Sequence, residues 1–255
     1  MIGVAGRIAL MAMFVVAQAA LAAAAELKIY STIGVKGAVE QLVPQFEKAS
    51  GHKLAITWAT AAMLVKRIEG GETADVLILT RAAIDTLSKE GKIAPGSEVA
   101  LASSGIAVAV KAGAPKPDIS TPEAFKQALL NAKSVAYSNP ASGGASGVYF
   151  ARLLDRMGIA DAMQAKTKYP PPGGNAADLL LTGEAELAIQ QKAEVMDVPG
   201  AEVVGLLPGD LNHVTAFAAG IGADSKNADA AKALIKLLQS PEAAAVFRAK
   251  GFGPS

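Results

Sequence analysis

Short apolar runs alternate along this chain with stretches in which apolar residues recur every three or four positions. The runs have the length of β-strands and cover residues 27–31, 54–60, 74–80, 105–113, 134–138 and 212–221. The periodic stretches predict helices at 35–50, 62–71, 82–93, 122–131 and from 145 onward, a further β–α alternation over 174–191, and two helices at the end. Repeated β–α units of this kind predict an α/β protein with mostly parallel sheets.

Prolines refine the predicted helix boundaries. The tripeptides TPE (121–123) and SPE (240–242) each read as an N-cap residue, a first-turn proline and a first-turn acid. Pro44 instead falls inside the helical pattern of 35–50, where it lacks the N–H that a helix interior needs. We therefore expect the helix to be kinked or locally interrupted there.

The first 25 residues follow a different pattern. Arg7 precedes an apolar stretch over residues 8–17, and small residues with possible cleavage points run on to Ala25. This order is typical of a secretory signal peptide, so we expect residues 1–25 to be removed and the protein to be periplasmic. A membrane anchor is the alternative, but the run is short for a span of about 20 residues and Gln18 interrupts it.

Charge balance and cysteine content exclude some classes of partner and of stabilisation. The chain has 24 basic and 23 acidic residues, and removing Arg7 leaves equal numbers of each, which argues against an electrostatic grip on nucleic acid. There is no cysteine, so the stability of the exported protein must come from packing. We expect a monomer without a cofactor.

The segment YSNPASGGASGVYFARLL (137–154) links a predicted strand to a predicted helix and is rich in serine and glycine. No lysine follows its glycines, which excludes a Walker loop, and the dinucleotide fingerprint is missing. Val148 stands where a nucleophile elbow needs its second glycine. The two histidines, His52 and His213, have no evident partners, and no metal-ligand spacing occurs. We therefore predict no catalytic residue and no metal site, which leaves binding.

Small polar residues gather where the predicted strands end. Ligands of open α/β sheets collect beyond the carboxyl ends of the strands, where helix N-termini present free N–H groups. Turn or cap chemistry explains any one such residue alone, but recurrence at successive strand ends favours a shared site. The predicted ligand-binding residues are Ser31, Thr32, Thr60, Arg81, Ser142, Ser146, Asn175, Gln190 and Gln191.

The chain resembles a known family from LKIYSTIGVKGAVEQLVPQFEKASGHKL through ADVLILT to SPEAAAVF. These segments are similar to the periplasmic solute-binding proteins of ABC transporters, in the molybdate-binding branch of the type II fold. The resemblance implies two α/β lobes joined by two crossover strands, with the ligand in the cleft between them. It also implies a permease in the cytoplasmic membrane as partner.

Applied to this chain, the resemblance gives lobe boundaries and a hinge. Lobe one would comprise 26–104 plus 217–255, and lobe two 105–216. The crossover segments near 103–106 and 214–218 would act as the hinge. Gly34 aligns where the molybdate proteins carry a serine, and Arg81 replaces an acidic residue that commonly follows the third strand.

Arg81 directs the expectation about the ligand. A guanidinium is a planar fork suited to a carboxylate, so a small organic carboxylate is the preferred ligand. Pairing of Arg81 with a nearby acid such as Asp85 is the alternative for this side chain. A molybdate-type oxyanion, held by hydroxyls and helix dipoles, is the alternative ligand, and a secreted enzyme on the same scaffold is the alternative class.

Overall fold

The computed structural model describes residues 24–254, and the predicted signal peptide lies almost entirely outside the described residues. The strands of the described part form one sheet in the order β2-β1-β3-β9-β4-β7-β5-β6, with β8 also paired to β4. Their bounds are β1 Glu26–Thr32, β2 Lys53–Ala59, β3 Val76–Thr80, β4 Val99–Lys111, β5 Val135–Tyr137, β6 Thr167–Lys168, β7 Leu187–Gln191, β8 Ala201–Leu206 and β9 Val214–Ile221.

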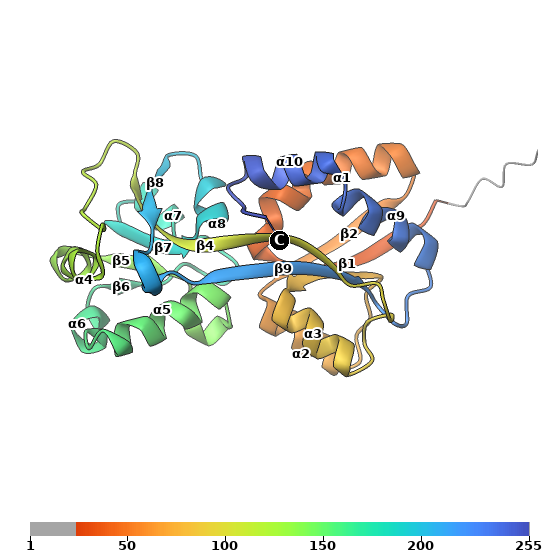
Figure 1. Ribbon diagram of the computed structural model, residues 1–255, viewed down its shortest axis with the longest axis horizontal. Coiled ribbons are helices and arrows are strands. Elements are labelled where there is room, and N and C mark those ends of the chain that lie inside the picture. The colour runs from red at the N-terminus through yellow and green to blue at the C-terminus, as the bar shows by residue number, and fades with distance from the viewer. Residues whose placement is uncertain (1–23, 255) are drawn as a thin grey trace, which may run out of the picture.

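Helices cover this sheet on both faces and at both ends (Figure 1). Their bounds are α1 Lys36–Ser50, α2 Ala61–Glu69, α3 Arg81–Lys89, α4 Pro122–Asn131, α5 Ala145–Arg156, α6 Ala160–Gln164, α7 Asp178–Leu181, α8 Lys192–Met196, α9 Ala228–Leu238 and α10 Pro241–Ala249. The described residues also form three short 3-10 turns, each after a strand: η1 Ile33–Val35, η2 Pro140–Ser142 and η3 Gly209–Leu211. The prediction of a sheet of β–α units flanked by helices is confirmed.

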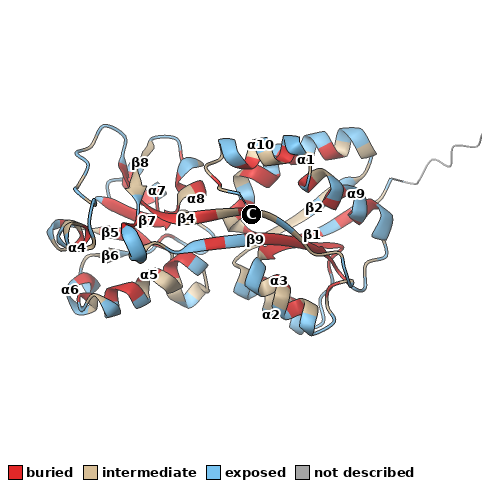
Figure 2. Cartoon of the chain, in the orientation of Figure 1, coloured by how far each residue is buried: buried red, intermediate tan, exposed pale blue. Residues whose placement is uncertain are grey.

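The core is divided between two bodies, which we call lobe one and lobe two. Two apolar clusters in lobe one draw on residues 27–102 and 217–252, and two in lobe two draw on residues 106–211. Ala193 of α8 is an exception, because it belongs by sequence to lobe two and packs in the core of lobe one. Figure 2 shows buried strands inside each lobe under helices that are exposed on their outer faces. The boundaries at 104/105 and 216/217 stay a prediction.

Two long antiparallel strands, β4 and β9, run from one lobe into the other (Figure 1). Parallel pairs build the rest of each lobe: β1 with β2 and β3, and β5 with β6 and β7. Strand β4 begins six residues earlier than the predicted run at 105–113, because its pairing with β9 continues from Gly105 back to Val99. The connection between the lobes is therefore part of the sheet itself.

The helix ends follow the expected capping chemistry. Thr121 accepts a hydrogen bond from the N–H of Ala124 at 3.1 Å, and Ser240 accepts one from Ala243 at 3.1 Å. The local interruption expected at Pro44 is absent, since α1 continues through it, and a kink there stays a prediction. Glu40, four residues earlier, is exposed, so water can bind the carbonyl that Pro44 leaves without a donor.

Replacing Pro44 and Pro122 with alanine should give different results. Pro44→Ala restores an N–H in the middle of α1, so we expect the free energy of unfolding to rise by about 1–3 kcal/mol. Pro122→Ala is the matched control, because proline is favoured at the first position of α4, and it should leave stability unchanged or slightly lower. Urea unfolding measures both. Equal effects of the two substitutions would contradict this account of α1.

Candidate functional site

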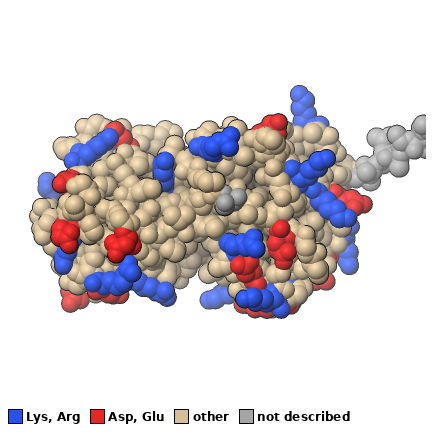
Figure 3. Space-filling view, viewed as in Figure 1, with Lys and Arg blue, Asp and Glu red and all other residues tan. Residues whose placement is uncertain are grey.

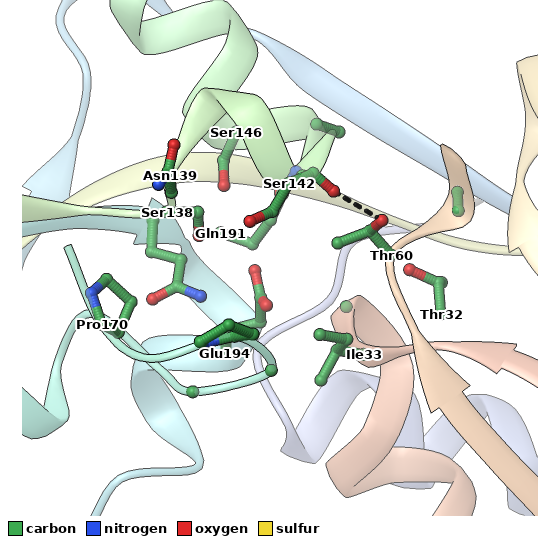
Figure 4. A pocket seen from close by; sticks show the side chains of 18 of the residues that line it. Thr32, Ile33, Thr60, Ser138, Asn139, Ser142, Ser146, Pro170, Gln191 and Glu194 are labelled. Carbon is green, nitrogen blue, oxygen red and sulfur yellow. Dashed lines mark hydrogen bonds between the residues drawn. The ribbon is translucent and has the colours of Figure 1, made fainter. Parts of the chain in front are cut away.

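A pocket lies between the two lobes, below the crossover strands. It encloses about 660 Å³, part of it open to solvent. Figure 4 shows lining side chains that reach into it from both lobes. The lining residues are Thr32, Ile33, Gly34, Thr60, Ala61, Thr80, Ser138, Asn139, Ser142, Gly144, Ala145, Ser146, Pro170, Pro171, Pro172, Gly173, Gly174, Gln190, Gln191, Glu194 and Phe217.

Lobe two supplies a serine-rich wall from the segment between β5 and α5. The chain leaves β5, turns through η2, and passes Gly143 with a φ of +69°, a backbone conformation that glycine adopts without strain. Gly144 then caps α5 without a side chain, so no side-chain acceptor satisfies the first N–H groups of this helix. Ser142 and Ser146 add hydroxyl groups beside them. This wall can donate hydrogen bonds to an anion.

Gly147 lets α5 lie directly against the end of β5. A Cβ atom on Gly147 would fall 2.0 Å from the carbonyl oxygen of Ser138, which is closer than any real contact. Only glycine therefore allows this approach, and the approach fixes where the N-terminus of α5 points. The predicted role of this motif as a helix start at a strand end agrees with its position in the structure.

Lobe one supplies threonines from the ends of its strands. Thr60 and Thr80 cap α2 and α3 by accepting hydrogen bonds from Met63 and Ala83, each at 3.3 Å. Thr60 also donates through its Oγ1 to the carbonyl oxygen of Ser142 at 2.8 Å, which joins the two lobes across the mouth of the pocket (Figure 4). The lobes therefore touch in this structure.

Two glutamines at the end of β7 also line the pocket. Gln190 accepts a hydrogen bond at Oε1 from the N–H of Ala176 at 2.7 Å. Gln191 donates from Nε2 to Oγ1 of Thr215 at 2.7 Å, while its buried Oε1 has no partner among the described residues. Thr215 can also donate, so a rotated amide would keep this bond and place its NH₂ group where the buried Oε1 now stands.

Glu194 is the charged residue of the lining, and no lysine or arginine lies among the lining residues that the structure describes. It stands in the first turn of α8, and Figure 4 shows its side chain pointing from α8 into the space below Ser142. Burial raises the pKa of Glu194 to about 7, although the Gln190 side chain acts to lower it, and the negative charge of Asp197 adds to the rise. The carboxyl group therefore changes charge near neutral pH.

Six of the nine predicted residues line this pocket, and their contact with a ligand stays a prediction. They are Thr32, Thr60, Ser142, Ser146, Gln190 and Gln191. Ser31 is fully buried beneath the wall and donates only a long bond, at 3.4 Å, to the carbonyl oxygen of Thr32. Side chains alternate along a strand, so the neighbour of a lining residue points the other way.

The placement of Arg81 and Asn175 needs correction. The Nε of Arg81 donates to Oδ1 of Asp85 at 2.8 Å on the exposed side of α3, outside the pocket lining. Asn175 accepts from Ala177 at 3.0 Å and donates to the carbonyl of Glu194 at 2.6 Å, so it stabilises a turn beside a neighbouring cavity. The structure thus favours the ion-pair alternative for Arg81.

Sequence reasoning did not find several lining residues. Ser138 and Asn139 belong to the serine- and glycine-rich segment 137–154 and directly follow β5, so strand-end reasoning can identify them. The sequence does not single out Glu194, because acids are common in the first turn of a helix, where the helix dipole stabilises them.

Outside the pocket, charges of both signs are mixed over the face shown in Figure 3. Within residues 24–254, no helix is both long and apolar enough to cross a membrane.

Substitution of Gly147 tests the close packing at the start of α5. Gly147→Ala must push α5 from β5, so we expect a loss of about 1–3 kcal/mol in the free energy of unfolding. Gly144→Ala is the control, because its Cβ would lie 3.5 Å from the Cβ of Ser138, an ordinary contact, and it should cost less than about 1 kcal/mol. Thermal unfolding of the two variants compares them directly. A Gly147 variant as stable as wild type would contradict the clash.

The raised pKa of Glu194 predicts a pH-dependent stability. The folded value of about 7 lies above the ordinary value of 4.5, so the folded state binds this proton more tightly and stability falls as pH rises between them. Glu194→Gln removes the effect. From pH 4.5 to 8, we expect the stability of this variant relative to wild type to rise by roughly 1–3 kcal/mol. Denaturant unfolding at several pH values measures this, and a pH-independent difference would rule out the shift.

Two proteins with similar sequences align with almost the whole chain. An aconitate isomerase of a Pseudomonas species is 38% identical over 234 residues, covering 89% of this chain and 87% of the relative. The molybdate-binding protein ModA of Escherichia coli is 26% identical over 249 residues, covering 94% and 93%.

Solved structures and a family model agree with these relatives. The periplasmic molybdate-binding protein of Azotobacter vinelandii superposes with a TM-score of 0.74 at 22% identity, over 90% of this chain and 99% of that one, which shows a shared fold. The model described as bacterial extracellular solute-binding protein matches residues 27–253. With its two lobes and a polar pocket between them, the chain belongs to this family of bacterial extracellular solute-binding proteins.

Proposed function

We propose that this protein captures a small organic acid between its lobes, outside the cytoplasmic membrane, and delivers it to the permease of an ABC uptake system. The family supports the coarse part of this function, the binding of a small solute. The resemblance to ABC transporter binding proteins supports the permease as partner. The signal-peptide pattern supports export, and the protein would work as a monomer.

The observation that carries the ligand class is the pairing of a donor wall with a carboxyl group. Hydroxyls of Ser142 and Ser146 and the uncapped N-terminus of α5 can bind the oxygens of an anion. Glu194 can share its proton with a second carboxylate, because its pKa of about 7 leaves it largely protonated below that pH. The relative with 38% identity is named for aconitate, which carries several carboxylates.

A molybdate-type oxyanion is the alternative ligand, supported by the names of other relatives. Two features of this pocket disfavour it. At Gly34, aligned with a serine of the molybdate proteins, a Cβ would lie only 3.0 Å from the Phe217 ring, so the phenylalanine fills the space of a side chain. Glu194, when ionised, would also repel a dianion that has no proton to share.

Conversion of the bound acid, in place of its delivery, is a second candidate function. It is supported by the name of the same relative, an isomerase, over 89% of this chain. The absence of a recognisable catalytic motif in the sequence predicts a protein that is not an enzyme. Motif reasoning cannot detect Glu194, because the surroundings of this residue arise only in the fold.

Titration calorimetry separates the two ligand classes. We expect heat and a saturating 1:1 isotherm with a di- or tricarboxylate such as aconitate, and weaker or no binding of molybdate and tungstate. Small-angle scattering should show a smaller radius at saturation, because the predicted hinge at 103–106 and 214–218 closes the lobes. Tight molybdate binding without carboxylate binding would contradict the proposed ligand class and support the oxyanion alternative.

Ser142→Ala plus Ser146→Ala should weaken carboxylate binding by about 10-fold or more, and the distant Ser97→Ala should not weaken it.

A further inference from the structure

A carboxyl group faces the proposed anion-binding wall of the cleft, and only its protonated form assists the binding of a carboxylate. Among the described lining residues Glu194 is the only one with a formal charge, and it has the same sign as the proposed ligand. When it is ionised it repels an anion, so anion binding alone gives no role to the charged form. An anionic base opposite hydrogen-bond donors is instead the arrangement that removal of a proton from carbon requires.

The surroundings of Glu194 provide no unpaired cation from the cavity beside it to stabilise the ionised carboxyl. The side chain lies in the wall between the cleft and a neighbouring cavity, where the uncharged Gln190 and Gln191 face it from β7. The charged groups that line the neighbouring cavity from α1, α7, α8 and the end of α10 are Lys36, Glu40, Asp178, Asp197 and Lys250. Lys250 pairs with Asp197 at 2.8 Å and Lys36 with Glu40 at 3.8 Å, so both cations that line this cavity already have an acidic partner.

The segment that carries Glu194 is fixed at its start by both crossover strands. Thr215 of β9 accepts from the Gln191 side chain at 2.7 Å, and Ser104 of β4 accepts from the N–H of Ala193 at 3.4 Å. Ser104 and Thr215 are partners in the β4–β9 register. The base would therefore sit on a rigid element, as a group that must meet one carbon atom requires.

We propose that the cleft catalyses an allylic proton shift in a bound unsaturated polycarboxylic acid, with the Glu194 carboxylate as the group that removes and returns the proton. This proposal rests on the proposed binding of an organic acid in the same cleft. The substrate class is an acid with a methylene group between a carboxylate and a carbon–carbon double bond, as in aconitate.

The step balances without an oxidant or a second substrate. The ionised Glu194 takes a proton from the methylene carbon: that C–H bond breaks and an O–H bond forms on Glu194. The electron pair left behind spreads over the allylic carbons into a carboxylate, whose oxygens gain negative charge beside Ser142, Ser146 and the N-terminus of α5. Glu194 then gives the same proton to the far allylic carbon, and the double bond has moved.

The pKa of Glu194, raised to about 7, suits this role. A base works best when its pKa lies near the working pH, since it is then both strong and partly ionised. The rate at low substrate should therefore rise with pH through about 7 and level off, as Glu194 loses its proton. A residue with a purely structural role would leave that profile unchanged.

The test follows the interconversion of cis- and trans-aconitate by proton NMR, with calorimetry of aconitate binding on the same samples. We expect the wild-type protein to interconvert the isomers and Glu194→Gln to do so at least about 100-fold more slowly while still binding aconitate. Glu90→Gln makes the same chemical change on the exposed surface at the end of α3, away from the cleft and its neighbouring cavity, and should behave like wild type. If Glu194→Gln does not fold, Glu194→Asp replaces it, and the displaced carboxylate should slow the reaction by about 10-fold or more.

Three results would overturn the proposal, and calorimetry tells them apart. Wild-type protein that binds aconitate without interconverting it would leave organic-acid binding intact and reject catalysis. Undiminished interconversion by the Glu194 variant would reject Glu194 as the base. Absence of aconitate binding would reject the proposed ligand class itself, and this inference with it.

Discussion

The antiparallel pairing of β4 with β9 is the interaction on which the pocket depends. Each strand runs through both lobes, so walls built from separate apolar cores face each other at a fixed point of one sheet. The partners Ser104 and Thr215 also bond to the chain at the end of β7, which carries Gln191 and leads into α8. Backbone pairing thus positions both the cleft and the carboxyl group inside it.

The electrostatics of the pocket follow from what lines it. Uncharged donors surround the space, so an anion would be held by dipoles and hydroxyls, which lose little energy when water leaves. The same shortage of cations leaves Glu194 without a counter-ion, and burial then favours its neutral form. One lining composition therefore accounts for both the proposed anion site and a carboxyl whose pKa lies near neutrality.

The sequence predicted the fold and much of the wall because both follow local rules. Strand ends and helix starts can be read from hydrophobic period and capping residues, and this placed Ser142, Ser146 and Thr60 correctly at one edge of the sheet. Arg81 was misplaced because Asp85, one helical turn on, holds its guanidinium on the surface of α3. Glu194 could not be found this way, since its burial and its lack of a cation come from elements distant in sequence.

Gly143 has a consequence for the balance between open and closed forms. A Cβ at this position would lie 2.7 Å from the Cβ of Ala62 in the opposite lobe, beside the hydrogen bond between Thr60 and Ser142. Any larger residue at 143 would hold the lobes apart at the mouth while leaving the donors of the pocket untouched. In the predicted hinge motion, the population of closed molecules without ligand, and with it the apparent affinity, would thus depend partly on a residue that has no side chain and that adopts a positive φ without strain.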